Sequence, residues 1–261
     1  MNKIKPDGFH TVEQISPDTY RIDEHGISNC YLAVGKERAL LIDSGCGIGN
    51  LKRTVEQLTA LPVDVVLTHA HCDHAGGVGW YERFFVHEAD GAFVYRILSS
   101  RLAARAIVGK NGKKSDFAKL PFRSKSVTIR NGHVFELGGR RITVVHTLGH
   151  TRGSIVLLDD NNKIMFTGDD INPFLWIWLP GCTSLKEWLP GGEKILELSK
   201  EYTPYCGHGS GLQTAEQMEK TINCVRDILA GRVKNTFFAK IKNHPYNSSD
   251  IQIIYNSRKV V

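Results

Sequence analysis

The sequence predicts a fold of the α/β (α+β) class, in which two sheets pack together and helices cover them. Short β-rich segments alternate with helical patterns through both halves of the chain, and glycines and prolines separate them. This alternation is typical of sheets that bury their faces against helices. At 261 residues the chain is long enough for one large core, so we expect a single domain over residues 1–261.

The first half is interpreted as strands followed by strand–helix units. Strands are expected at 19–23, 29–34, 39–43, 63–67 and 84–86. A glycine-rich turn at 44–50 leads into a helical pattern over 51–61, which Pro62 stops, and a second helix is expected over about 88–107. Residues 109–126 are polar, basic and contain glycine and proline, so we interpret them as an exposed insertion.

The second half is expected to continue with strands and to end in a helical C-terminal part. The strands fall at 134–137, 141–146, 154–158 and 163–167. An aromatic-rich loop is expected at 174–178. The helical patterns cover 184–201, with an interruption at Pro190, and 214–230, and a β-like tail follows at 251–255.

Composition excludes several classes of protein. The net charge is +6, but the 33 basic residues are scattered, which favours a solvated surface and argues against a nucleic-acid partner. No apolar run is long enough to cross a bilayer, so no membrane partner is expected. The first nine residues lack the apolar region of a secretory signal, which predicts a cytoplasmic location. The expected partner is a small-molecule substrate, and the oligomeric state stays open.

One short segment concentrates metal-ligating side chains. His69, His71, Asp73 and His74 lie within six residues, directly after the apolar run 63–67. A lone histidine is more often a core or surface residue, whereas four donors in one turn indicate a metal site. Imidazole suits zinc and iron, and a carboxylate can bridge two ions.

Further donors follow predicted strands downstream. His150 comes after the strand at 141–146, Asp169 comes after Gly168, and His208 lies between two glycines. Asp170 is the rival of Asp169. Because loops at strand ends carry side chains that need not pack, all of these positions suit a functional site.

At these residues the chain resembles the metallo-β-lactamase fold superfamily. It matches that superfamily's HxHxDH pattern at 69–74, GHTxGS at 149–154, TGD at 167–169 and GHG at 207–209, in the same order. The resemblance covers roughly residues 10–209. It implies a four-layer αββα sandwich with a dinuclear metal site at one edge of the two sheets.

Carried over position by position, the resemblance assigns seven ligands to two divalent metal ions. His69, His71 and His150 go to the first ion, Asp73, His74 and His208 go to the second, and Asp169 bridges them. Zinc is the expected metal, and iron or manganese suit the same donors. A hydroxide held between the ions would attack the substrate, and Asp73 would also act catalytically by carrying its proton.

Two positions at which the chain differs from particular branches of the superfamily limit the reactions that we expect. An aspartate at 169 argues against an antibiotic-cleaving β-lactamase, and a histidine at 71 argues against the flavodiiron oxidoreductases. The full ligand set is shared with glyoxalase II-like enzymes and lactonases, so we expect a hydrolase of an ester, thioester or lactone. The alternatives are a phosphodiesterase, nuclease or β-lactamase of the same fold, or a non-catalytic metal-binding protein. Structural zinc sites are closed and rich in thiolates, which argues against the last alternative.

The aromatic segment after Asp169 has two interpretations. Phe174, Trp176 and Trp178 could wall the substrate pocket and favour a partly apolar acyl group. The same side chains could equally pack in the core or in a subunit interface.

Overall fold

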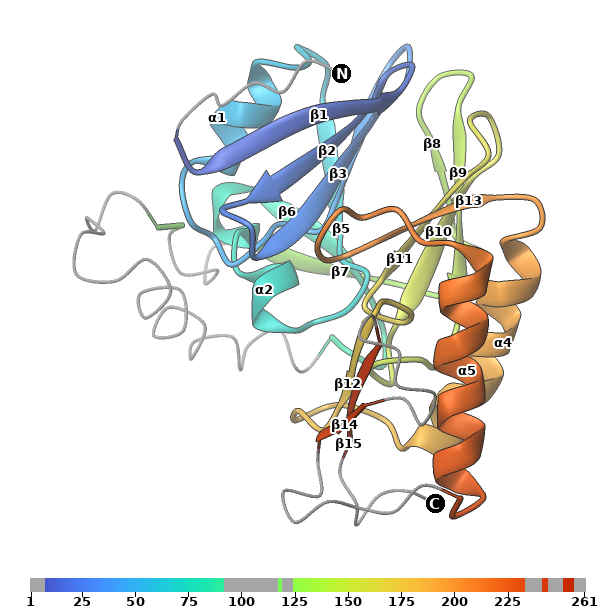
Figure 1. Ribbon diagram of the computed structural model, residues 1–261. Coiled ribbons are helices and arrows are strands. Elements are labelled where there is room, and N and C mark those ends of the chain that lie inside the picture. The colour runs from blue at the N-terminus through green and yellow to red at the C-terminus, as the bar shows by residue number, and fades with distance from the viewer. Residues whose placement is uncertain (1–7, 92–116, 119–123, 233–240, 244–250, 256–261) are drawn as a thin grey trace.

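The protein consists of two large sheets, one small sheet and helices on the outer faces (Figure 1). The structure is a computed structural model that describes residues 8–91, 117–118, 124–232, 241–243 and 251–255. The predicted helix over 88–107 falls mostly outside these residues. Within them, no helix is long and apolar enough to cross a membrane.

The first sheet has seven strands in the order β1-β2-β3-β4-β5-β6-β7. Pairs from β1 to β4 are antiparallel, and pairs from β4 to β7 are parallel. The strands are β1 His10–Ser16, β2 Thr19–Glu24, β3 Ser28–Val34, β4 Ala39–Ile42, β5 Val63–Val66, β6 Arg83–His87 and β7 Lys125–Ile129.

The second large sheet has five strands, in the order β13-β11-β10-β9-β8, and a third sheet has the order β12-β15-β14. The strands of the second sheet are β8 Val134–Glu136, β9 Arg141–His146, β10 Ile155–Asp159, β11 Ile164–Gly168 and β13 Thr203–Cys206. The strands of the third are β12 Phe174–Ile177, β14 Ile241–Asn243 and β15 Gln252–Tyr255.

Sequence signals at the N-termini of the two long helices explain where these helices begin. Ser184 and Thr214 each form a capping box, in which the hydroxyl accepts from the backbone N–H three residues on. The helices are α1 Leu51–Glu56, α2 Cys72–Ala75, α4 Leu185–Leu198 and α5 Ala215–Leu229, with a 3₁₀ turn at Val78–Trp80.

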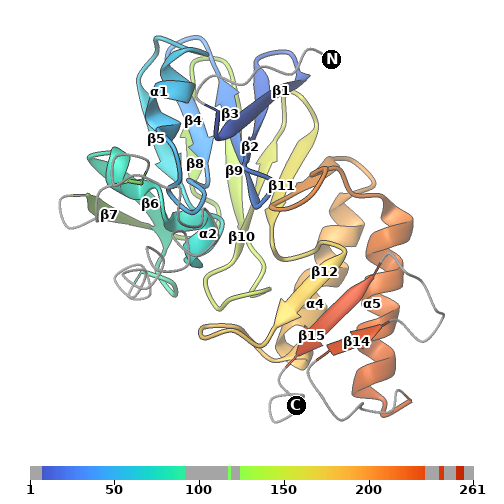
Figure 2. The same cartoon turned by 60° about the vertical axis from the view of Figure 1, so that its left-hand side comes forward.

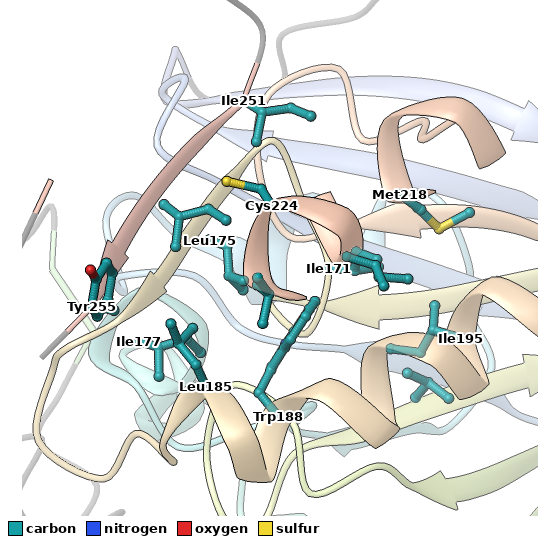
Figure 3. Packing of buried hydrophobic residues seen from close by; sticks show 14 of the residues in the cluster. Ile171, Leu175, Ile177, Leu185, Trp188, Ile195, Met218, Cys224, Ile251 and Tyr255 are labelled. Carbon is teal, nitrogen blue, oxygen red and sulfur yellow. The ribbon is translucent and has the colours of Figure 1, made fainter. Parts of the chain in front are cut away.

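Three apolar clusters separate four layers. Strands such as β4 and β5 are buried on both faces: Leu41 and Val65 pack toward α1, and Leu40 and Val66 pack toward the second sheet. On the far side, α4 and α5 cover the second and third sheets around Trp188 (Figures 2 and 3). The observed αββα order is the predicted fold class.

Several expectations differ from the structure, among them the end of the first helix, which is at Glu56 and not at residue 61. Residues 174–177 form strand β12 rather than a loop, because they pair with β15 at the far end of the chain. Helix α4 runs through Pro190 without interruption. Proline at the sixth helical position removes the hydrogen bond to the Lys186 carbonyl and crowds that carbonyl, and the capping box and the burial of Trp188 offset these costs.

The predicted exposed insertion at 109–126 is also wrong where the structure describes it. Phe117 and Ala118 are buried, and residue 117 bridges Ile48. Apolar side chains at these two positions explain the burial. Lys125 already begins β7, and the remainder of 109–126, apart from residues 124–126, lies outside the described residues.

Candidate metal centre

The metal-ligating residues predicted from the sequence gather at one edge of the two large sheets. His69 follows β5, His150 follows β9, Asp169 follows β11 and His208 follows β13. Strands β9, β11 and β13 run in the same direction, because β9 and β11 are each antiparallel to β10 and β13 is parallel to β11. Their carboxyl ends therefore meet at one edge.

Three of these side chains form a first group of nitrogen donors. One donor atom each from His69, His71 and His150 lies within 4.8 Å of the others. The His71 Nδ1 is 2.7 Å from the His150 Nε2. Burial lowers the pKa of His69 and of His150 well below the usual range, so these rings are neutral and offer lone pairs.

The other four form a second, mixed group. Asp73, His74, Asp169 and His208 place their donor atoms within 4.8 Å of one another. The Asp169 carboxylate lies 3.3 Å from the His74 Nε2, 3.0 Å from the His208 Nε2 and 4.0 Å from the His150 Nε2 of the first group. The Asp169 carboxylate thus lies between the two groups.

Charge in the second group follows from its carboxylates. Burial by itself lowers the pKa of His74 and of His208. The nearby Asp169 carboxylate outweighs it, and raises the pKa of His74 well above its usual range and that of His208 to about 9. Although burial would raise the pKa of Asp169, His208 and His74 hold it well below its usual range. The protons on His74 and His208 balance the negative charge of Asp169. A metal cation bound at the same place would replace these protons and balance the same charge.

Hydrogen bonds from one nitrogen of a histidine ring decide which nitrogen is left to face the donor group. The His71 Nε2 donates to the Pro180 carbonyl (3.0 Å), the His208 Nδ1 donates to the Ile27 carbonyl (2.7 Å), and the His74 Nδ1 donates to the Asp43 carboxylate (2.9 Å). Because carbonyl and carboxylate oxygens only accept, each ring presents its other nitrogen inward. Metal-ligating histidines are held in this way.

Orphaned atoms provide the test of whether a metal fits. The His69 Nε2 is buried and makes no hydrogen bond to any described residue, and the buried His74 Nε2 and Asp169 Oδ1 face each other at 3.3 Å with no further hydrogen bond among the described residues. Buried polar atoms without a partner are costly and rare. Imidazole and carboxylate atoms that converge without partners fit divalent cations, so the donor set can hold metal.

Three buried carboxylates hold the donor loops in place. Asp43 accepts from the Thr68 N–H (2.7 Å) and hydroxyl (2.8 Å) besides His74. Asp90 accepts from the Ala70 N–H, the Thr151 hydroxyl and the Gly153 N–H, and so joins the cradle at 69–74 to the loop of His150. Sequence reasoning missed Asp43 and Asp90 in this role, although Asp43 ends a predicted strand.

Asp170, the rival of Asp169, is the third of these carboxylates and has its own partners. Its carboxylate accepts from the Thr147 hydroxyl and from the His150 N–H (2.7 Å). It lies outside both donor groups. Asp170 therefore fixes the backbone of the His150 loop, and Asp169 is the carboxylate between the two groups.

Glu24 holds the glycine-rich turn beside the site. Its carboxylate accepts from the Cys46 N–H (2.6 Å) and the Ile48 N–H (2.8 Å). Gly45 has a φ of +66°, and a Cβ there would lie 2.7 Å from the Glu24 carboxyl carbon, so the turn requires glycine. Burial raises the pKa of Glu24 to about 7, although His10 and the two N–H donors lower it.

This pKa predicts a pH-dependent effect of Glu24→Gln. The pKa in the folded state lies above the ordinary value of 4.5, so the stability that Glu24 contributes is present below about pH 4.5 and is lost as the pH rises through 7. The free energy of unfolding of the wild type minus that of Glu24→Gln should fall by about 2 kcal/mol between pH 5 and pH 8. Urea unfolding at both pH values measures it.

The subtraction removes groups that titrate in both proteins. Glu201→Gln, at an exposed ion pair with Lys163, is the matched control and should give a difference that is flat with pH. A flat difference for Glu24→Gln as well would show that the buried carboxylate ionises as freely as in the unfolded chain.

A cavity of about 580 Å³ opens over the donor groups. Asp73, Asp169 and His208 line one side, together with His71 and His150. The other side is largely apolar and is lined by residues including Ile27, Cys46, Phe174, Trp176 and Leu179. This volume is typical of small-molecule sites.

Comparison with known proteins gives the family. Residues 24–211, which contain all seven donors, match the description "Metallo-beta-lactamase superfamily". The chain belongs to the metallo-beta-lactamase superfamily. The sequence-based prediction of this superfamily and of its fold is confirmed.

Relatives in the superfamily include named thioesterases. The chain is similar to the acyl-coenzyme A thioesterase MBLAC2 of Gallus gallus, with 32% identity over 66% of this chain and 67% of that protein. The human MBLAC2 is 29% identical over 66% and 68%. The atrochrysone carboxyl ACP thioesterase of Aspergillus fumigatus is 29% identical over 74% of this chain and 53% of its own. These relatives agree with the predicted reaction class, hydrolysis.

Solved structures show the same metallo-beta-lactamase fold. A metallo-beta-lactamase family protein of Thermus thermophilus has a TM-score of 0.59 at 20% identity and covers 84% of this chain and 82% of its own. A metallo-beta-lactamase from Pontibacter korlensis has a TM-score of 0.58 at 22% identity, with coverage of 82% and 97%.

Proposed function

We propose that this chain is a metal-dependent hydrolase of acyl thioesters that works with two divalent cations. The observation that carries the proposal is the Asp169 carboxylate between two donor groups at the base of a partly apolar cavity. The named thioesterases among its relatives support the thioester as the substrate class.

The ligand assignment follows the two groups. His69, His71 and His150 would hold one ion, Asp73, His74 and His208 the other, and Asp169 both. We propose zinc, because three imidazoles and shared carboxylates are typical zinc donors; iron and manganese suit the same atoms. When bound, such ions make water nucleophilic near neutral pH and stabilise negative charge on an acyl oxygen.

The residues of the chain contribute orientation and proton transfer. In thioester hydrolysis, water adds to the acyl carbon, the C–S bond breaks, and the products are a carboxylic acid and a thiol. We propose that Asp73 accepts the proton of the attacking water and passes it to the sulfur of the leaving thiol. Its carboxylate lines the cavity, and its side chain is 28% exposed against 12% for Asp169, the other carboxylate of the donor groups. The Asp73 Oδ2 is 3.5 Å from the His208 Nε2 and 3.7 Å from the His74 Nε2, beside the second donor group.

The apolar wall of the cavity favours an acyl substrate over a phosphodiester. Phe174, Trp176 and Leu179 offer no charge to a phosphate. An acyl chain placed against them displaces water from the reacting carbonyl, which strengthens every electrostatic interaction there.

A substrate panel tests the proposal. Metal-loaded protein is assayed with acyl-coenzyme A thioesters, a lactone, a β-lactam and bis-p-nitrophenyl phosphate. We expect the highest kcat/KM on the thioesters and a loss of about 100-fold or more in Asp73→Asn, as for removal of a general acid or base. Hydrolysis of the phosphodiester alone, or of no substrate at all, would overturn the proposal.

A further inference from the structure

Strand β12 exposes an aromatic face that is built into the fold rather than carried on a loop. Its side chains alternate. Leu175 and Ile177 are buried in the cluster around Trp188 (Figure 3), whereas Phe174 is 52% and Trp176 is 38% exposed. Large aromatic side chains exposed in this way usually mark a contact surface.

Pairing with the end of the chain fixes the position of this face. Leu175 pairs with Ile253 and Trp176 with Ile254, in parallel register. Leu175 and Ile253 are both fully buried in the same cluster, which β12 and β15 share with α4 and α5 (Figure 2). The backbone that carries Phe174 and Trp176 is therefore held by a packed sheet, which suits a site that must bind one ligand in one geometry.

The exposed face and the donor groups share one cavity. Phe174 and Trp176 line the same space of about 580 Å³ as Asp73 and Asp169, and Ile27 continues the apolar wall. A ligand with its carbonyl at the donor groups can therefore lay an apolar chain along β12. The side chain of Trp178, in contrast, is 39% exposed and is not among the residues that line this cavity.

We propose that Phe174 and Trp176 of β12, with Ile27 and Leu179, form the binding site for the acyl chain of the substrate, and that Trp176 sets the preferred chain length. The proposal rests on the proposed function and specifies its substrate class as thioesters of apolar, multi-carbon acyl groups. An acetyl group is too short to reach from the donor groups along two successive outward residues of a strand, which lie about 7 Å apart.

The main rival occupant is a second copy of this chain. Exposed Trp178, whose ring centroid is 6.2 Å from that of Trp176, would extend such an interface beyond the cavity. The cavity favours the acyl chain, because its apolar wall continues directly into the reactive groups. Measuring the mass of each variant in solution separates the two occupants.

The kinetic test uses a series of saturated acyl-coenzyme A thioesters from two to sixteen carbons. In the wild type, kcat/KM should rise about fourfold per methylene buried against the wall and then level off. In Trp176→Ala and Phe174→Ala the rise should be much shallower, so that kcat/KM falls far more for the long acyl chains than for the acetyl thioester. Trp178→Ala is the matched control and should keep the wild-type profile.

A binding measurement separates this proposal from the proposed function. S-dodecyl coenzyme A, a thioether that cannot be hydrolysed, is titrated into metal-free protein by calorimetry. Trp176→Ala should weaken binding by about tenfold relative to wild type and Trp178→Ala. If no thioester is hydrolysed but this pattern is found, the proposed function fails and the apolar binding site remains.

Three results would overturn the inference. One is an unchanged chain-length profile together with unchanged thioether binding in Trp176→Ala. Another is an equal loss in Trp178→Ala, which would indicate a general disturbance of the segment. The third is a wild-type dimer that dissociates in Trp176→Ala, which would assign the aromatic face to an interface.

Discussion

Asp169→Asn is expected to lower kcat/KM for thioester hydrolysis by about 1000-fold and to leave the protein folded. Asparagine keeps the shape of the side chain but removes the negative charge and one of the two ligating oxygens. Asp169 contacts His74 and His208 at 3.3 and 3.0 Å and faces His150 at 4.0 Å, so its loss affects both proposed ions at once.

Metal content separates this explanation from misfolding. Mass spectrometry of the purified variant should show less bound metal than wild type, and circular dichroism should show an unchanged fold. Glu201→Gln on the exposed surface controls for the change of a carboxylate to an amide. An Asp169→Asn enzyme with full metal content and activity within tenfold of wild type would mean that Asp169 does not bridge.

Trp188→Ala is expected to lower the free energy of unfolding by about 3–5 kcal/mol. Trp188 is fully buried at the centre of the cluster between α4, α5 and the sheets (Figure 3). Its Nε1 also donates to the Asp170 carbonyl (2.6 Å), directly beside the donor Asp169. The variant should therefore lose activity as well as stability, and chemical unfolding and the thioester assay measure the two effects.

Two further variants divide the effect into its parts. Trp188→Phe keeps most of the buried ring but removes the hydrogen bond, so it should cost less, about 1–3 kcal/mol. Trp178→Ala removes a half-exposed indole and should change stability by less than about 1 kcal/mol. Equal losses in Trp188→Ala and Trp178→Ala would contradict the packing shown here.

Local pattern was sufficient to find the donor residues. The segment 69–74 places four donors in one turn, His150 and Asp169 each follow a strand whose apolar pattern is visible in the sequence, and His208 is marked by the glycines on either side of it. The structure brings these seven together in two groups. Their chemical roles stay predictions until metal and activity are measured.

The supporting carboxylates could not be predicted, because their role depends on contacts between distant segments. Asp90 links loops at 70 and 151–153, and Glu24 holds a turn at 46–48. Nothing in the residues around Asp90 or Glu24 distinguishes them from surface carboxylates. Only the three-dimensional structure shows which backbone N–H groups they satisfy.

Strand β12 was missed for a related reason. An aromatic run with Pro173 before it and Pro180 after it is typical of a loop, and no local signal reveals that β15 pairs with it. Long-range strand pairing overrode local propensity here. The sequence suggested that Phe174, Trp176 and Trp178 could all wall the substrate pocket. In the structure Phe174 and Trp176 line the cavity, and Trp178 does not.

Metal stoichiometry tests the central claim most directly. Metal-free protein is titrated with zinc by calorimetry, and the bound metal is counted by mass spectrometry after removal of the excess. Two donor groups that share Asp169 predict about two ions per chain, with thioesterase activity reaching its maximum only when both are bound. Saturation at one ion, with full activity at that point, would contradict the dinuclear account.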